Sequence, residues 1–115
     1  MLLSEVAANL SLDPVSLPAN DVQVRSGYAS DLLSDVLAKA GEGALWVTNQ
    51  KHQNVIGVAV MLDLAGVIVA GGVELDANTV ANAIEEKVAL YKTDKTLYEV
   101  AGRMYEIGIP PASGR

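Results

Sequence analysis

Three short apolar segments recur at a fixed interval along the second half of the chain, and this spacing limits the possible folds more than any other feature. The segments are 44–48 (ALWVT), 66–70 (GVIVA) and 88–91 (VALY), whose first residues are 22 positions apart each time. A helix-length segment separates each pair. Alternating strands and helices imply parallel strands joined by right-handed crossovers. Continuous aliphatic strands are typical of a sheet covered on both faces. We therefore expect a small three-layered α/β domain with a mainly parallel sheet built from short βα units.

The ends of the helices can also be predicted. Asp76 is placed to cap a helix over 77–87, with Ala77, Val80, Ala81 and Ile84 on its inward face. Thr96 and Glu99 have the spacing of a capping box for the last helix, and Gly108 followed by two prolines ends it. Ser30 is the expected cap of a helix that runs to Lys39, and residues 22–25 alternate like a strand. We expect one domain over 1–109 and a disordered tail over 110–115.

Composition excludes several classes of function. The 115 residues carry a net charge of −6, which disfavours a protein that binds a nucleic-acid backbone. There is no Cys and only one His, so thiolate zinc sites and multi-His metal sites within one chain are excluded. We expect no metal and no cofactor. The N-terminus has no basic segment of the kind found in signal peptides, and Asp63 interrupts the apolar run 55–73, so we expect a cytoplasmic protein with no membrane segment.

Polar loops follow the predicted strands at the edge where ligands bind in open parallel sheets. The first is the run of six polar residues 49–54, the second is the Gly71-Gly72 pair, and the third is 92–94. The candidate ligand-binding residues are Ser30, Asp31, Asn49, Gln50, His52, Asn54, Gly71, Gly72 and Thr93. Such a set suits a base, a ribose or a phosphate, with glycine backbone N–H groups close to the ligand. The alternative is that these are ordinary exposed loops.

Catalytic interpretations rest on few residues. Asp31 and Asp35 share one face of a predicted helix, where paired carboxylates can bind Mg²⁺ or act as acid and base, but they can equally favour the positive helix end. His52 is the one side chain that titrates near neutrality unperturbed, and its alternative role is a hydrogen bond at a helix entry. Neither a dinucleotide fingerprint nor a P-loop is present, and we expect no enzymatic activity.

A helix over 55–62 (VIGVAVML) has no polar position, although a surface helix normally leaves one face to water. This pattern predicts a homodimer, with Val55, Val58 and Leu62 as candidate contacts. Tyr98 and Tyr105, seven residues apart, form the other candidate contact. The alternative is that the sheet and a helix over 2–10 bury the apolar helix within one chain.

The segments GYASDLLSDVLAKA, LWVTNQKHQNVIGVAVMLDLAGVIVAGG and TLYEVAGRMYEIGI resemble a stand-alone DRTGG domain. The resemblance runs from about Leu2 to Ile109, although the pentapeptide that names the family is absent and Gly71-Gly72 is its nearest remnant. Such domains are similar to the N-terminal domain of HPr kinase/phosphorylase. They also occur between CBS domains in regulated pyrophosphatases and beside phosphotransacetylase domains, and some stand-alone members are similar to hydrogenase-associated regulators.

This resemblance implies a non-catalytic regulatory and oligomerisation module that serves a partner enzyme or signalling protein. The alternative is a small-molecule sensor that binds a nucleotide or a phosphorylated metabolite at the carboxyl edge of the sheet. A third possibility is an enzyme that uses Asp31, Asp35 or His52.

Overall fold

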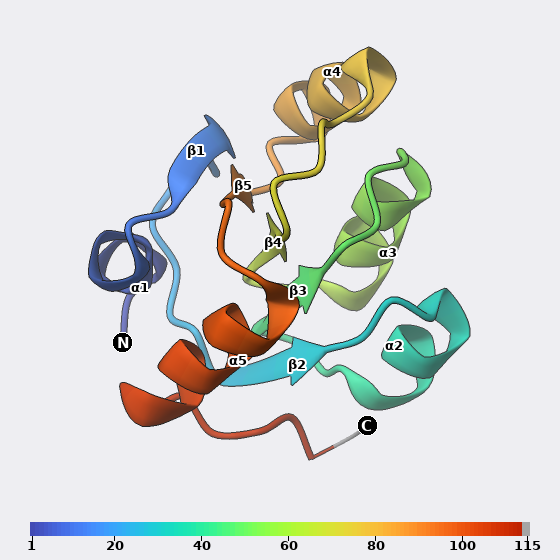
Figure 1. Cartoon of the computed structure of the whole chain (residues 1–115). Helices are drawn as coiled ribbons and strands as arrows, with labels where there is room; N and C mark the ends of the chain where they lie inside the picture. Colours follow the sequence, from blue (N-terminus) through green and yellow to red (C-terminus); the bar gives the residue numbers. More distant parts are fainter. Residues whose placement is uncertain (114–115) are drawn as a thin grey trace.

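The computed structural model describes residues 1–113, which form a three-layered α/β domain (Figure 1). In chain order the elements are α1 (Leu3–Leu10), β1 (Asp13–Ser16), β2 (Ser26–Ala29), α2 (Leu33–Lys39), β3 (Ala44–Thr48), α3 (Asn54–Leu62), β4 (Gly66–Val69), α4 (Ala77–Glu86), β5 (Leu90–Lys92) and α5 (Leu97–Glu106). The five strands form one sheet in the order β1-β5-β4-β3-β2. The strands from β2 to β5 are parallel, and β1 joins the edge antiparallel to β5. The predicted fold class is confirmed.

The helices divide between the two faces of the sheet. The crossover helices α2, α3 and α4 cover one face, while α1 and α5 cover the other (Figure 1). Successive residues of β3 alternate between these layers, so that Leu45 and Val47 pack towards α1 and α5, whereas Trp46 packs towards the crossover helices. All five residues of β3 are buried, as expected for a central parallel strand.

Most element boundaries in the second half agree with the sequence pattern. The strand at 44–48 is confirmed, and β4 ends one residue before the predicted limit. β5 begins at Leu90 and not at Val88, because the chain leaves α4 through Lys87 in the left-handed conformation and the Val88 N–H still bonds the Ala83 carbonyl. The capping box of Thr96 and Glu99 is present at α5.

The first half departs further from the pattern. The strand is β2 at Ser26–Ala29, while residues 22–25 make only isolated contacts, among them a bridge from Gln23 to Leu2. α2 begins at Leu33, and Ser30 accepts a hydrogen bond from the Leu32 N–H before the helix starts. α4 turns Thr79 and Ala83 inward and leaves Ile84 57% exposed, which corrects its predicted inward face.

Residues 110–112 do not belong to the disordered tail expected over 110–115. The Gly27 N–H donates to the Pro110 carbonyl at 2.8 Å, and the Ala112 N–H donates to the Gly27 carbonyl at 2.9 Å. The segment therefore runs parallel to β2 at the edge of the sheet, where a strand with two prolines can still use its carbonyls as acceptors. Residues 114 and 115 lie outside the described part of the chain. Within residues 1–113, no helix combines the length and apolar character needed to cross a membrane.

Candidate functional site

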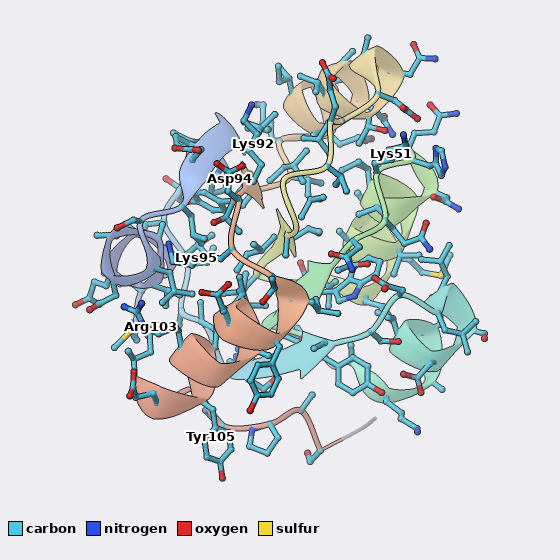
Figure 2. All side chains as sticks on the ribbon, in the orientation of Figure 1. Lys51, Lys92, Asp94, Lys95, Arg103 and Tyr105 are labelled. Atoms are coloured by element: carbon cyan, nitrogen blue, oxygen red, sulfur yellow. The ribbon has the colours of Figure 1, made fainter. Side chains whose placement is uncertain are left out.

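The carboxyl ends of the four parallel strands meet at one edge of the sheet, and most of the predicted ligand-binding residues lie there. Ser30 and Asp31 follow β2, residues 49–54 follow β3, the glycine pair follows β4, and Thr93 follows β5. Figure 2 shows Lys51 at the start of α3 and Lys92 and Asp94 at the end of β5. We refer to this polar region as the carboxyl edge.

Asp31 links the first two of these loops. Its Oδ1 accepts a hydrogen bond from the Thr48 hydroxyl at 2.8 Å and another from the Asn49 N–H at 2.6 Å. Its backbone carbonyl accepts from the Gln50 side chain at 2.9 Å. Asp31 therefore does not serve as a favourable charge on the first turn of a helix. Its carboxylate instead satisfies the hydroxyl of Thr48, which is fully buried at the end of β3.

The glycine turn differs from the bare backbone that the sequence suggests. Gly71 and Gly72 both adopt positive φ angles, +84° and +67°. The Gly71 N–H donates to the Lys95 carbonyl at 2.7 Å and the Gly72 N–H to the Thr93 carbonyl at 3.0 Å, so both donors are used inside the protein. Neither N–H is available to cradle a phosphate, and that part of the prediction is wrong.

Two polar side chains approach the glycine turn closely. A Cβ added at Gly71 would lie 3.1 Å from Asn49 Oδ1, and one added at Gly72 would lie 3.2 Å from Asp94 Oδ1. The absence of glycine side chains therefore lets Asn49 and Asp94 lie against the turn. Asn49 belonged to the predicted set, but Asp94 did not, although it stands in the polar loop after the third apolar segment.

A polar groove of about 370 Å³ opens beside this turn. Its lining consists of Asp13, Gly72, Val73, Glu74, Lys92, Thr93 and Asp94. Three carboxylates and one ammonium group thus share the groove. Thr93 is buried, and its hydroxyl accepts a hydrogen bond from the Lys95 N–H, which positions the loop after β5. The strand β1 that supplies Asp13 was not predicted, because Pro14 marks a break in the sequence pattern.

His52 lies on the other side of the carboxyl edge, next to α4. Its Nδ1 is 2.8 Å from Asp76 Oδ2, and both side chains are substantially exposed. Asp76 holds the N-cap position of α4 but makes no side-chain cap, because its carboxylate turns to His52 instead. Asn54 is exposed at the first position of α3. A buried link runs alongside the pair, since the Thr79 hydroxyl donates to the Lys51 carbonyl at 2.8 Å.

The two aspartates of the predicted pair have separate partners. Asp35 accepts hydrogen bonds from the Tyr28 hydroxyl at 2.6 Å and from Lys39 Nζ at 3.1 Å. The tyrosine hydrogen bond, with help from Lys39, lowers the pKa of Asp35, and the same hydrogen bond raises the pKa of Tyr28 to about 12. In the described chain no three His, Asp or Glu side chains are grouped to hold a metal ion.

The interface candidates divide into two groups. Val55, Val58 and Leu62 are buried beneath their own chain, so the prediction that these three contact a partner is wrong. They pack in the apolar layer between the sheet and the crossover helices. Tyr98 and Tyr105 are 87% and 71% exposed.

Comparison with known proteins supports the fold. No family model matches the chain, and no curated protein matches it. Among solved structures, the chain is similar to the CBS and DRTGG domains of the regulatory region of Clostridium perfringens pyrophosphatase, complexed with the activator diadenosine tetraphosphate. The TM-score is 0.68 at 13% identity, over 89% of this chain and 45% of that chain.

At this level of identity the likeness concerns the fold alone. The chain spans less than half of the regulatory region that it matches. A fold like that of CBS and DRTGG domains is therefore confirmed, while the similarity to HPr kinase/phosphorylase stays a prediction.

Proposed function

We propose that this chain is a non-catalytic regulatory domain, formed by residues 1–109, that binds a small ligand at the carboxyl edge and serves a partner enzyme or signalling protein in the cytoplasm. The observation that carries the proposal is the grouping of Asn49, Lys92 and Asp94 around the glycine turn, beside a groove of about 370 Å³. A groove of this size lies within the range of small-molecule sites. The similar fold of a pyrophosphatase regulatory region supports the regulatory role.

The ligand class that we propose is a nucleotide or a phosphorylated metabolite. The Asn49 carboxamide offers both a donor and an acceptor, which suits the edge of a base. The Asp94 carboxylate accepts hydrogen bonds, which suits ribose hydroxyls. The clostridial regulatory region of similar fold was solved with diadenosine tetraphosphate, a ligand of this class.

Charge decides where the parts of such a ligand lie. Three of the four charged groups in the groove are carboxylates, so a phosphate deep in the groove would be repelled. The sugar and base therefore belong in the groove, and the phosphate belongs at its rim, towards the exposed ammonium group of Lys92.

Thermal unfolding with and without ligand tests the proposal. We expect ATP, AMP or diadenosine tetraphosphate to raise the Tm, because a ligand that binds only the folded state stabilises it by mass action. A ligand at 100 times its Kd adds about 2.7 kcal/mol, which corresponds to a shift of about 10 °C in a domain of this size. Lys92→Ala should lose most of that shift.

Lys39→Ala is the matched control, because it also removes an exposed ammonium group, but from α2 at the opposite edge of the sheet. This variant should keep the full ligand response. The proposal fails if no ligand in the panel raises the Tm, or if Lys39→Ala weakens the response as much as Lys92→Ala does.

A further inference from the structure

The outward face of α3 is apolar and open to the surroundings. It presents Gly57, Val60 and Met61, and the two larger side chains are 51% and 73% exposed. A groove of about 360 Å³ runs between this face and α4. Its lining consists of Ile56, Gly57, Val60, Met61, Asn82 and Glu86. We call it the helix groove, and it lies on the face of the sheet that α5 does not cover (Figure 1).

Gly57 is the open part of the helix groove. A Cβ added there would meet no atom within 4 Å, so no contact within the described chain requires a glycine at this position. A glycine inside a helix costs about 0.5–1 kcal/mol relative to alanine. The missing side chain instead leaves room for a group from outside to approach the backbone of α3 closely.

Negative charge gathers where α3 and α4 end. Both helices connect parallel strands, so their C-terminal ends lie at the same edge of the sheet. α4 ends with Glu85 and Glu86, Asp63 follows α3, and neither helix has a basic residue in its last turn. The helix dipole is negative at this end, so it disfavours carboxylates there.

No cation of residues 1–113 pairs with these three carboxylates within 4 Å. Lys87 follows Glu86 in the chain and is exposed, but it forms no ion pair with it. Arg25, which lines a separate groove with Asp63, pairs with Glu42. The C-terminal end of the helix groove is therefore available to a positively charged partner.

We propose that the helix groove binds an amphipathic, basic helix of a partner protein. The apolar side chains of that helix lie on Gly57, Val60 and Met61, and its lysine or arginine side chains pair with Glu86 and the neighbouring carboxylates. An apolar groove is a common binding site for the apolar face of a helix. An extended peptide would leave its backbone groups unpaired, because the walls of this groove are helices whose backbone groups are bonded internally. A helix satisfies its own backbone and avoids this cost.

Charge indicates that the occupant is a different protein and not a second copy of this chain. No helix within the described residues carries a net positive charge, so a second copy offers no basic helix. Each copy also has a net charge of −6, and like charges repel. Complementary charge therefore selects a basic partner. This inference gives the proposed regulatory domain a surface for its partner, and it does not depend on the ligand proposed at the carboxyl edge.

Fluorescence anisotropy with a synthetic peptide tests the helix groove. The probe is a dye-labelled peptide of about 18 residues, or about five helical turns, with leucines at i, i+3, i+4 and i+7 and lysines on the opposite face. A counterpart peptide has the same apolar face but carries glutamates in place of the lysines. We expect the full chain to bind the lysine peptide at low salt and the glutamate peptide about tenfold more weakly.

Two variants of the groove have matched controls on α5, on the other face of the sheet. Glu86→Lys should weaken binding of the lysine peptide about fivefold and strengthen binding of the glutamate peptide, because it reverses a charge that lines the groove. Gly57→Gln fills the open position with a neutral polar side chain and should weaken binding of the lysine peptide about tenfold. Glu106→Lys changes the net charge equally, and Gly102→Gln fills another helical glycine that has open space around it.

Both α5 variants should bind the lysine peptide as tightly as the unmodified chain does. The inference is overturned if the unmodified chain does not bind the lysine peptide, if it binds both peptides equally, or if the α5 variants weaken binding as much as the groove variants. A doubled mass of the unmodified chain in sedimentation equilibrium that returns to 12.0 kDa in Gly57→Gln would assign the groove to a second copy and overturn it as well. The nucleotide-induced Tm shift of Gly57→Gln, measured without peptide, reports separately on the carboxyl edge.

Discussion

At the scale of single residues, Asp31 is the polar side chain whose removal should cost most. It accepts from the buried Thr48 hydroxyl and from the Asn49 N–H. Asp31→Ala leaves these donors without their acceptor, and a buried donor without a partner costs about 1–3 kcal/mol. Urea unfolding followed by the fluorescence of the buried Trp46 should show this loss. Asp31→Asn keeps one acceptor oxygen and should lose less, and equal stability of all three proteins would contradict the assignment.

The hydrogen bond between Tyr28 and Asp35 predicts a pH dependence. The folded-state pKa of Tyr28 is raised from 10.0 to about 12, so between these values the unfolded chain loses this proton while the folded chain retains it. The stability from this bond is fully present below pH 10 and is lost as the pH rises through 12. The pKa of Asp35 is lowered, so at the acid end the contribution is present above its ordinary value and falls away as Asp35 is protonated.

Tyr28→Phe provides the measurement for this pair. The difference in the free energy of unfolding between the unmodified chain and this variant should be constant at neutral pH and shrink above pH 10. The comparison cancels Tyr91, whose pKa is also raised, mainly by burial, because Tyr91 is common to both proteins. A difference that does not change from neutral pH to pH 12 would exclude the bond as the cause.

The location of the polar residues in the fold could be predicted from the sequence, but their hydrogen-bond partners could not. The polar loops after the strands lie at one edge as expected, because that follows from parallel topology alone. The partner of Asp31 is 17 positions away and that of His52 is 24 positions away, and local spacing carries no information on such pairs. Asp76 shows the consequence, since its position suits a helix cap but its carboxylate bonds His52.

At the scale of elements, two glycines on the same stretch of chain should respond in opposite ways to alanine. A Cβ at Gly66 in β4 would lie 3.1 Å from the Ala89 Cβ and 3.2 Å from the Ala89 carbonyl oxygen. Overpacking of this kind costs about 1–3 kcal/mol. A Cβ at Gly57 in α3 meets nothing, so Gly57→Ala should stabilise by about 0.5–1 kcal/mol through helix propensity.

Thermal or urea unfolding of the two variants measures these opposite effects under the same conditions. Each variant serves as the control for the other, since both add one methyl group. If Gly66→Ala is as stable as the unmodified chain, β4 and β5 are not packed as closely as described.

The sequence predicts the elements that have a strong local pattern of apolar or capping residues. It does not predict the elements whose position or inward face depends on tertiary contacts. The aliphatic strands and the capping box of α5 carry their own signals. β1 carries no such signal, because Pro14 predicts the end of a regular element. An edge strand nevertheless tolerates a proline. The predicted inward face of α4 is wrong for a related reason. The hydrogen bond from Thr79 to the loop before α3 turns Thr79 and Ala83 inward, and tertiary contacts of this kind override the local pattern.

At the scale of the whole molecule, the connection order explains why α3 is covered. Four sequential parallel strands with right-handed crossovers place α2, α3 and α4 on one face, so α3 lies between two neighbouring helices. Its apolar residues Val55, Val58 and Leu62 are buried by this layer and need no second chain. The other face would be bare without α1 and α5, which come from the two ends of the chain. The prediction that Val55, Val58 and Leu62 form an interface is wrong because the sequence of one helix does not show which neighbours cover it.

The segment after α5 gives the last prediction, because it closes the edge of the sheet that the crossover helices leave open. Truncation after Ile109 removes both hydrogen bonds to Gly27 and the prolines that line an apolar cavity of about 150 Å³ between α5 and β2. Two such bonds contribute about 1–3 kcal/mol together, so the truncated chain should unfold at a lower urea concentration. A chain that ends at Ser113 keeps both bonds and should match the full chain. If residues 110–115 were only a disordered tail, all three chains would be equally stable.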